Sequence, residues 1–285
     1  MFAISGLACC WPGTASADWI FDLDAATIYD NNLSRAYESP DIVSDIALAG
    51  AMSVGQYFTI DDRNGVALTA NLRTVNYQGF HGMNSLALGA TVTYRRKLGL
   101  GLYAPSIKVS GTLAQENYRQ SVRDGQRSEW SVSISKRLSE RLELSGGGNF
   151  EKFGARHVMQ LSPERSGNAF DIKGRNLFAR VDYALTDRWL GFAGINLRRG
   201  EVVASTRADD EVFDVASAVT RDPAFGPDYV AYRLSGETRS ANVGVSREIN
   251  SRASLNLTLA RDITSATSGL SYRRTVAHAA FVYGF

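Results

Sequence analysis

The feature that most constrains the fold of this chain is an alternation of apolar and polar residues with a period of two. In ASLNLTLARD, the apolar Leu255, Leu257 and Leu259 alternate with polar or small residues, and SLALGATVTY and SVSIS follow the same rule. Successive side chains of a strand point to opposite faces, so this period indicates strands with one apolar and one polar face. Frequent glycine (26), rare proline (6) and many Tyr and Phe residues (12 and 13) also favour strands over helices.

The alternation predicts about twelve strands joined by two kinds of connection. The strands are expected at residues 18–30, 44–57, 64–78, 84–96, 104–118, 127–138, 141–153, 173–186, 188–203, 232–248, 252–262 and 269–285. Even-numbered connections are mostly tight turns such as LSE, TD and INS, whereas the odd-numbered ones include long polar loops. Transmembrane barrels sort periplasmic turns from extracellular loops in this way. We therefore expect an all-β fold, a single transmembrane antiparallel up-and-down β-barrel.

The N-terminal stretch has the pattern of a secretory signal peptide. A short apolar run in MFAISGLACCWPGTASA ends at Ala15-Ser16-Ala17, a small-residue cleavage signature. We predict a signal peptide at residues 1–17 and a barrel at residues 18–285; a buried N-terminal strand and lipidation at Cys9 are the alternatives. Cleavage after Ala17 removes both cysteines, so the exported chain would need no disulfide.

Aromatic residues on the apolar faces fall near the predicted strand ends. Those at the turn end are Trp19, Tyr94, Tyr183, Trp189, Tyr283 and Phe285, and those at the loop end are Tyr29, Trp130 and Phe150. Amphipathic rings prefer the two membrane–water interfaces, so we expect two girdles in contact with outer-membrane lipid. A soluble β-sandwich gives no reason for such girdles.

Two short stretches resemble known families. The C-terminal AHAAFVYGF, with Ala279, Phe281 and Tyr283 spaced two apart before a final Phe285, resembles the assembly signal of Gram-negative outer-membrane barrels. That resemblance implies an outer-membrane location and recognition of the last strand by the barrel-assembly machinery. TIYDNNLSRA at 27–36 is similar to the first strand of surface-lipoprotein assembly modifier barrels, which implies a secretion or surface-protein partner. An Asx-rich turn at a strand end is the other interpretation of the same residues.

The polar faces of the predicted strands would line the barrel lumen. The titratable residues expected there are Asp22, Asp24, Arg73, Arg95, Lys108, Glu116, Glu143, Glu151, Arg180, Asp182, Arg198, Arg274 and His278. Acidic and basic charges nearly balance, which predicts no strong ion selectivity. Small residues such as Ser131 and Ser133 leave space between the charges, and twelve strands enclose more space than the eight-stranded barrels that side chains can fill. We expect a narrow water-filled channel; a salt-bridged plug is the alternative. Barrel closure would place His278 near Asp24 or Asp22.

These features favour a porin-like channel for small solutes in the outer membrane of a Gram-negative bacterium. An export or assembly barrel for surface lipoprotein or polysaccharide is one alternative, and an outer-membrane enzyme is another. The chain has three histidines, and neither His81 nor His157 has the neighbours of outer-membrane lipases. The sequence contains no P-loop, dinucleotide fingerprint, zinc-like Cys/His set or haem motif, so we expect no cofactor and no metal site. A net charge of +2 gives no indication of a nucleic-acid partner.

Overall fold

The computed structural model describes residues 17–161, 165–208 and 214–284. The predicted signal peptide therefore lies outside the described residues, apart from Ala17. The strands are β1 (Ala17–Asp30), β2 (Asp45–Thr59), β3 (Asn64–Tyr77), β4 (Ser85–Lys97), β5 (Ser106–Tyr118), β6 (Gly125–Arg137), β7 (Leu142–Ala155), β8 (Ile172–Ala184), β9 (Trp189–Arg207), β10 (Ala218–Arg221), β11 (Tyr229–Asn250), β12 (Ala253–Ala266) and β13 (Ser271–Gly284). Three short 3-10 helices, η1 (Ser39–Asp41), η2 (His81–Met83) and η3 (Ser121–Arg123), lie in loops. No helix in the described part of the chain has the length and apolar character needed to cross a membrane.

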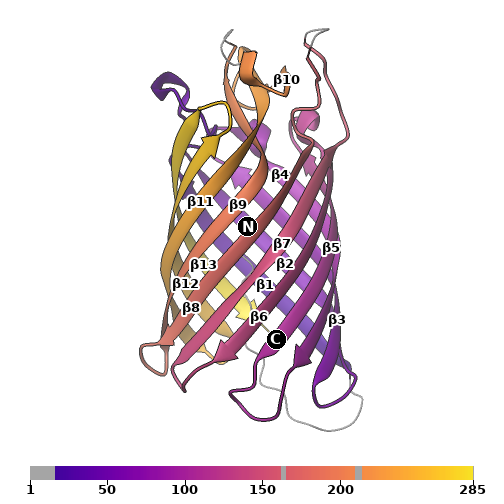
Figure 1. Cartoon of the computed structure of the whole chain (residues 1–285), viewed down its shortest axis with the longest axis vertical. Helices are drawn as coiled ribbons and strands as arrows, with labels where there is room; N and C mark the ends of the chain where they lie inside the picture. The colour runs from indigo at the N-terminus through magenta and orange to yellow at the C-terminus, as the bar shows by residue number, and fades with distance from the viewer. Residues whose placement is uncertain (1–16, 162–164, 209–213, 285) are drawn as a thin grey trace.

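All the strands except β10 form a closed antiparallel barrel (Figure 1). Each of these strands pairs with its neighbour in chain order, and β13 pairs with β1. β9 pairs directly with β11, so the four-residue β10 stays outside the ring and pairs with the loop-side part of β11. Thirteen strands less β10 leave twelve in the barrel, which confirms the predicted fold class. Closure satisfies the backbone hydrogen bonds of the wall without an open edge.

The largest departure from the predicted strand bounds is the hairpin of β9 and β11. Alternation predicted that these strands end at 203 and begin at 232, whereas they reach Arg207 and Tyr229. The added residues Ala204 and Val230 pack into a small apolar core with Val202 and Tyr232. Both faces of the hairpin are covered there, so the contrast between apolar and polar faces on which the prediction relied is lost.

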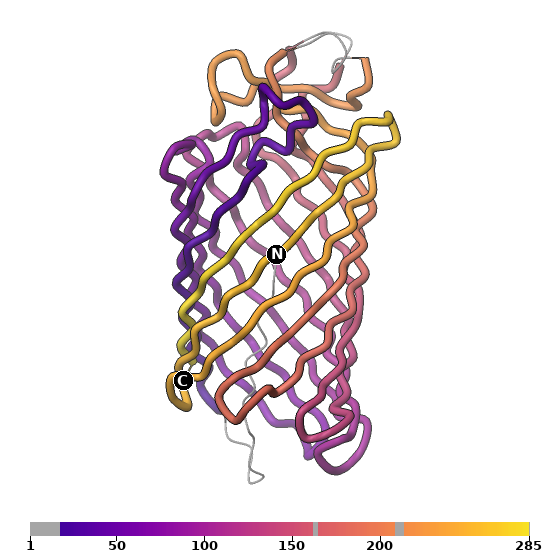
Figure 2. The backbone as a smooth tube through the Cα atoms, turned by 90° about the vertical axis from the view of Figure 1, so that its left-hand side faces the viewer, coloured from indigo at the N-terminus to yellow at the C-terminus, as the bar shows by residue number. Residues whose placement is uncertain are grey.

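Tight turns gather at one end of the barrel and longer connections at the other (Figures 1 and 2). The turn end carries residues 60–63, 98–105, 138–141, 185–188 and 251–252, and the C-terminus lies there (Figure 2). The loop end carries 31–44, 78–84, 119–124, the described parts of 156–171 and 208–228, and 267–270. This arrangement agrees with the predicted sorting of the connections.

The two faces of the wall differ in chemistry. One face exposes large apolar side chains, such as Leu113 (65% exposed), Leu177 (64%) and Ile195 (65%). The other face carries ion pairs that connect strands, including one between β7 and β9. Because burying apolar surface away from water is favourable, a wall with apolar side chains outside and charges inside suits a lipid environment.

Candidate functional site: the barrel lumen and its loop-end roof

The register assigns each strand residue to the lumen or to the outer wall. Residues directly opposite each other in an antiparallel pair share a face. Starting from exposed Leu177, which faces outward, its neighbours Asn176 and Phe178 face inward. Followed around the ring, the inward row contains the residues predicted for the lumen: Asp22, Asp24, Arg73, Arg95, Lys108, Glu116, Glu143, Glu151, Arg180, Asp182, Arg198, Arg274 and His278.

A network of ion pairs lines the lumen near the loop end of β5 to β9. Arg127 Nε lies 2.5 Å from Glu116 Oε1, and Arg127 Nη1 lies 3.4 Å from Glu151 Oε2. Arg198 Nε donates to the other oxygen of Glu151 at 2.7 Å. The intervening β8 has Gly174 opposite Glu151, which leaves space for the Arg198 side chain to cross. The network therefore holds four charges against one side of the wall.

A second network joins the closure seam to β12. Arg274 on β13 donates from Nη2 to Asp30 Oδ2 on β1 at 2.5 Å, and its Nη1 lies 3.7 Å from Asp262 on β12. Asp30 is almost fully buried (2% exposed), and its Oδ1 accepts the backbone N–H of Asn32. The Asn32 side chain donates to the carbonyl oxygens of Ala36 and Arg273. The TIYDNNLSRA stretch thus ties the first loop to the seam, the structural role that an Asx-rich turn would have.

The turn half of the lumen carries cations without close carboxylate partners. Arg95 and Lys108 are direct cross-strand neighbours on β4 and β5. Among the described residues, no carboxylate lies within ion-pair distance of either side chain. Arg180 is paired instead with Asp182 on its own strand at 2.6 Å, and Glu143 lies 4.0 Å from Arg137. The nearly balanced charge count therefore hides a positive patch on β4 and β5, whereas Asp22 and Asp24 on β1, also in the turn half, have no ion-pair partner among the described residues.

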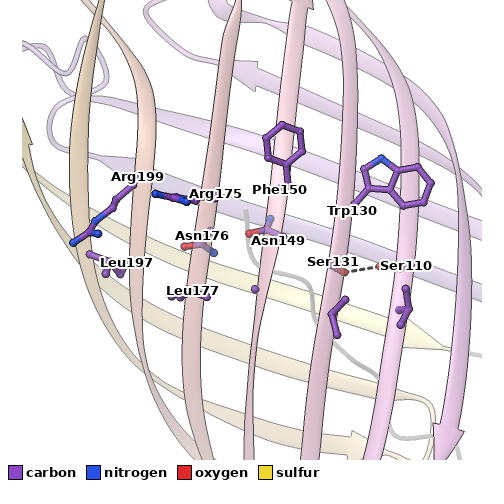
Figure 3. Close-up of a pocket in the computed structure, with 13 residues that line it drawn as sticks. Ser110, Trp130, Ser131, Asn149, Phe150, Arg175, Asn176, Leu177, Leu197 and Arg199 are labelled. Atoms are coloured by element: carbon purple, nitrogen blue, oxygen red, sulfur yellow. Dashed lines mark hydrogen bonds between the residues drawn. The ribbon is translucent and has the colours of Figure 1, made fainter.

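Small hydroxyl and amide side chains cover much of the remaining lumen wall. They hydrogen-bond sideways to the next strand rather than across the lumen: Ser53 to Asn71, Asn71 to Thr91, and Thr91 to Thr112, each at 2.9 Å. Ser110 and Ser131 form a similar pair at 2.7 Å (Figure 3). Because these small polar side chains hydrogen-bond to neighbours within the wall, they do not extend across the lumen, and the centre of the lumen is left for water.

A crossing segment, residues 214–228, lies over the loop end of the barrel (Figure 2). It starts from the β9–β11 side and reaches the loops of β3–β4 and β5–β6. The Phe225 ring lies 5.3 Å from the Phe80 ring, and the backbone of Ala224 lies against Gly82, where a Cβ would come within 2.6 Å of Ala224 Cα. In the ring order β9 and β11 stand opposite β3 and β4, so the crossing segment spans the mouth of the barrel.

A buried ion pair fixes the crossing segment. Arg123 of η3 donates from Nη2 to Asp222 Oδ2 at 2.5 Å and from Nε to Oδ1 at 3.0 Å, and Ser205 Oγ donates to the same carboxylate at 2.5 Å. Asp222 is fully buried, and the Arg123 guanidinium lies 4.6 Å from the centre of the Phe170 ring. Burial by itself would lower the pKa of Arg123, but the charge and hydrogen bonds of Asp222 outweigh burial and raise it. Arg123 therefore stays charged.

His278 does not contact the acidic residues predicted beside it. It pairs across the seam with Ile28, whereas Asp24 pairs with Val282, and no ion pair joins His278 to Asp24 or Asp22. The expected ion pair is absent because the seam is staggered by four residues relative to the register assumed, although His278 and Asp24 still interact electrostatically.

The predicted interface aromatics lie on the outward row of their strands. The most exposed are Trp19 (67%), Trp130 (63%), Phe150 (48%), Tyr183 (45%), Tyr29 (44%) and Trp189 (40%). Tyr94 and Tyr283 are half-buried on the same row, and Phe285 lies outside the described residues. Trp130 lies over Gly111 of the adjacent strand, where a Cβ would meet its ring at 2.8 Å.

Several lumen residues were missed in the sequence analysis. These residues are Arg127, Asp30 and Asp262, which complete the two networks. The alternation along their strands could have identified them as inward-facing. Arg127 lies three positions from outward Trp130, and an odd spacing along a strand means the opposite face. Arg123 and Asp222 carry no such signal, because they lie in loops that are 99 residues apart in the chain.

The three histidines lie in different parts of the fold. His81 is in η2, where its Nδ1 lies 2.9 Å from the Tyr77 carbonyl oxygen, and His157 is in the loop after β7. Within the described ranges, no group of three or more His, Cys, Asp or Glu side chains could hold a metal ion.

No protein-family model matches the chain, and no curated protein matches its sequence. Solved structures do match in fold. An outer membrane channel from Pseudomonas putida F1 is similar with a TM-score of 0.63 at 12% identity, covering 96% of this chain and 97% of that one. The KdgM porin in complex with disordered oligogalacturonate matches with a TM-score of 0.46 at 10% identity (93% and 99% covered), and the NanC porin with 0.46 at 8% identity (92% and 98% covered). This chain and the Pseudomonas putida F1 channel therefore share the barrel fold.

Proposed function

We propose that this protein is an outer-membrane channel for small water-soluble solutes, with the crossing segment 214–228 over its extracellular mouth. The observation that carries the proposal is the lumen wall. Small polar side chains on β2 to β6 bond sideways to one another, and the loop-half charges are paired against the wall. The similarity in fold to an outer membrane channel supports the proposal.

Outer-membrane placement is part of this proposal. The apolar outer wall, the outward aromatic residues near the strand ends and the absence of open barrel edges all suit a bilayer. We propose that β13 is recognised by the barrel-assembly machinery, because its outward row Ala277, Ala279, Phe281 and Tyr283 presents the alternation of such signals. The tight turns would then face the periplasm.

The export alternative is not favoured by the seam. A barrel that passes or assembles another protein would be expected to have a disrupted junction between its first and last strands. β1 and β13 instead pair without a break from Asp22–Gly284 to Asp30–Val276, and Arg274 bridges them to Asp30.

The test is conductance of the purified barrel in planar lipid bilayers, with a variant pair that separates the lumen from the outer wall. Ser133→Trp places a large ring in the lumen and should lower single-channel conductance, whereas Val132→Trp on the adjacent outward position should leave it unchanged. If neither the wild type nor a variant with a released crossing segment conducts above the detergent baseline, the salt-bridged plug is the correct description.

A further inference from the structure

At the loop end of the barrel, the outer wall carries a belt of basic side chains on only one side of the circumference. Outward positions near the loop end of β8 to β13 hold Lys173, Arg175, Arg199, Arg239, Arg261 and Arg273, here called the basic belt. Among the strand residues of β1 to β6, the corresponding outward positions are apolar or neutral, for example Ile46, Leu86 and Gln126. If these basic side chains served only to position the barrel at the membrane surface, we would expect them around the whole circumference.

The belt lies at the height of lipid headgroups. Arg175 is three residues from the loop end of β8 (Ile172), and Arg273 is two residues from that of β13 (Ser271). On the lipid face of a barrel, an arginine is strongly destabilising at the bilayer midplane and has little cost near the interface. The belt is therefore tolerated at the interface on the loop side, which is the outer leaflet in the proposed orientation.

The belt has more positive charge than its own carboxylates neutralise. Glu237 accepts from Arg199 at 2.6 Å and from Arg239 at 2.8 Å. In the described part of the chain, no carboxylate lies within ion-pair distance of Arg175 or Arg273. The guanidinium groups of Arg175 and Arg273 can thus donate hydrogen bonds to an external anion.

An apolar recess adjoins the belt. It has a volume of about 720 Å³ and lies on the outer wall of β5 to β9, where Gly148 leaves the backbone uncovered between Val132 and Leu177. Arg175 and Arg199 lie together at one edge of it, on the same cross-strand row as Phe150 and Trp130 (Figure 3). Two guanidinium groups next to an apolar recess match a ligand that has phosphate beside acyl chains.

We propose that this half of the outer wall binds a phosphorylated glycolipid of the lipid A type, with one phosphate on Arg175 and Arg199 and an acyl chain in the recess. Guanidinium groups hold phosphate through paired, charge-assisted hydrogen bonds. A headgroup with two phosphates suits a belt that continues over β11 to β13, which a phospholipid with a single phosphate would not fill. The proposal depends on outer-membrane placement but not on conduction.

The experiment is native mass spectrometry of the detergent-purified barrel, titrated separately with bisphosphorylated lipid A, dephosphorylated lipid A, phosphatidylglycerol and inorganic phosphate. We expect bisphosphorylated lipid A to bind most tightly. The Arg175→Ala/Arg199→Ala variant should bind it about tenfold more weakly or worse, because it loses the charge-assisted hydrogen bonds of two guanidinium groups to phosphate. Arg96→Ala/Lys136→Ala, which removes two outward cations from the turn end, is the matched control and should bind like the wild type.

Three results would overturn the proposal: equal binding by the wild type and the Arg175/Arg199 variant, equal binding of phosphatidylglycerol, and equal binding of dephosphorylated lipid A. The last two comparisons use only the wild type, so they hold even if the variant fails to fold. Bilayer conductance of the same preparations separates this proposal from the channel itself, because lost lipid binding with unchanged conductance concerns the outer wall alone.

Discussion

Replacing Asp222 with alanine should release the crossing segment and increase conduction. Asp222 is fully buried and receives three donated hydrogen bonds, two from Arg123 and one from Ser205. The variant keeps a charged Arg123 whose side chain is only 13% exposed and has lost its counter-ion. The bound position of the crossing segment is therefore destabilised relative to the released one.

The size of the effect follows from the burial of the pair. Removing one partner of a buried ion pair costs about 3–5 kcal/mol, since the remaining charge is left uncompensated. Because Arg123 retains some contact with solvent, we take the lower end, about 3 kcal/mol. At about 1.4 kcal/mol per factor of ten, this shifts the equilibrium toward the released segment by roughly 100-fold. The barrel itself should stay folded, since neither residue belongs to the strand pairing of the ring.

Two measurements report the release. Single-channel conductance of Asp222→Ala in planar bilayers should rise or show longer open periods, and limited proteolysis of intact cells should cut the crossing segment faster than in the wild type. Asp228→Ala is the matched control, because it removes an exposed carboxylate from the same segment and should change neither readout. An uncharged test is Gly82→Val, whose side chain would collide with the backbone of Ala224 and push the segment away.

The reasoning would be refuted by faster proteolysis without any change in conductance. The segment would then be released as expected, and the resistance of the channel would lie elsewhere. If Asp222→Ala and Gly82→Val both leave the proteolysis rate at the wild-type value, the crossing segment is held mainly by contacts other than the ion pair.

Three further predictions concern facing, selectivity and a turn. Val92→Arg should destabilise the folded barrel by about 2–4 kcal/mol, because Val92 faces outward near the middle of β4, whereas Thr91→Arg should not; equal urea midpoints would show that the register is wrong. Replacing both Arg95 and Lys108 with glutamate should shift the reversal potential of a KCl gradient toward cation selectivity, and an unchanged potential would mean that these residues are remote from the ion path. Hydrogen bonds from the Asn64 side chain and the Arg63 backbone lower the pKa of Asp61 in the β2–β3 turn. Its carboxylate signal should therefore titrate below pH 3.8 in NMR. The ionised Asp61 should stabilise the turn above that pH, and this stabilisation should be lost as the pH falls through the lowered pKa of Asp61.

The wall of this barrel could be predicted from the sequence because each of its strands separates apolar from polar residues locally. Leu255, Leu257 and Leu259 identify the outward face of β12 without knowledge of any other strand. The same rule places Arg127 inward from the position of Trp130. The faces of the strands, the sorting of turns and loops, and the fold class depend only on such short-range patterns.

The roof could not be predicted, because it depends on contacts between loops that are distant in the chain. In the sequence, Arg123 and Asp222 are polar loop residues and Phe80 and Phe225 are single aromatic residues in loops. Nothing in the sequence pattern indicates that the members of each pair are in contact. The stagger of the seam escaped prediction for a related reason. Alternation fixes which face a residue occupies but not the height at which two strands meet, so it could place His278 in the lumen but could not show that Ile28 is its direct cross-strand partner.

The placement of charges indicates where a solute would meet resistance. From outside, it first meets the crossing segment with its buried ion pair, and then the paired charges of Arg127, Glu151 and Arg274 just below the mouth. Beyond these, the wall carries small hydroxyl groups and then the cations Arg95 and Lys108, which have no close carboxylate partners. Paired charges present little net field to a passing ion, whereas unpaired ones present a strong field. The loop half of the lumen is therefore expected to limit the size of a solute and the turn half to select its charge. The Asp222 and Arg95/Lys108 variants should accordingly change different properties: the first conductance, the second ion preference.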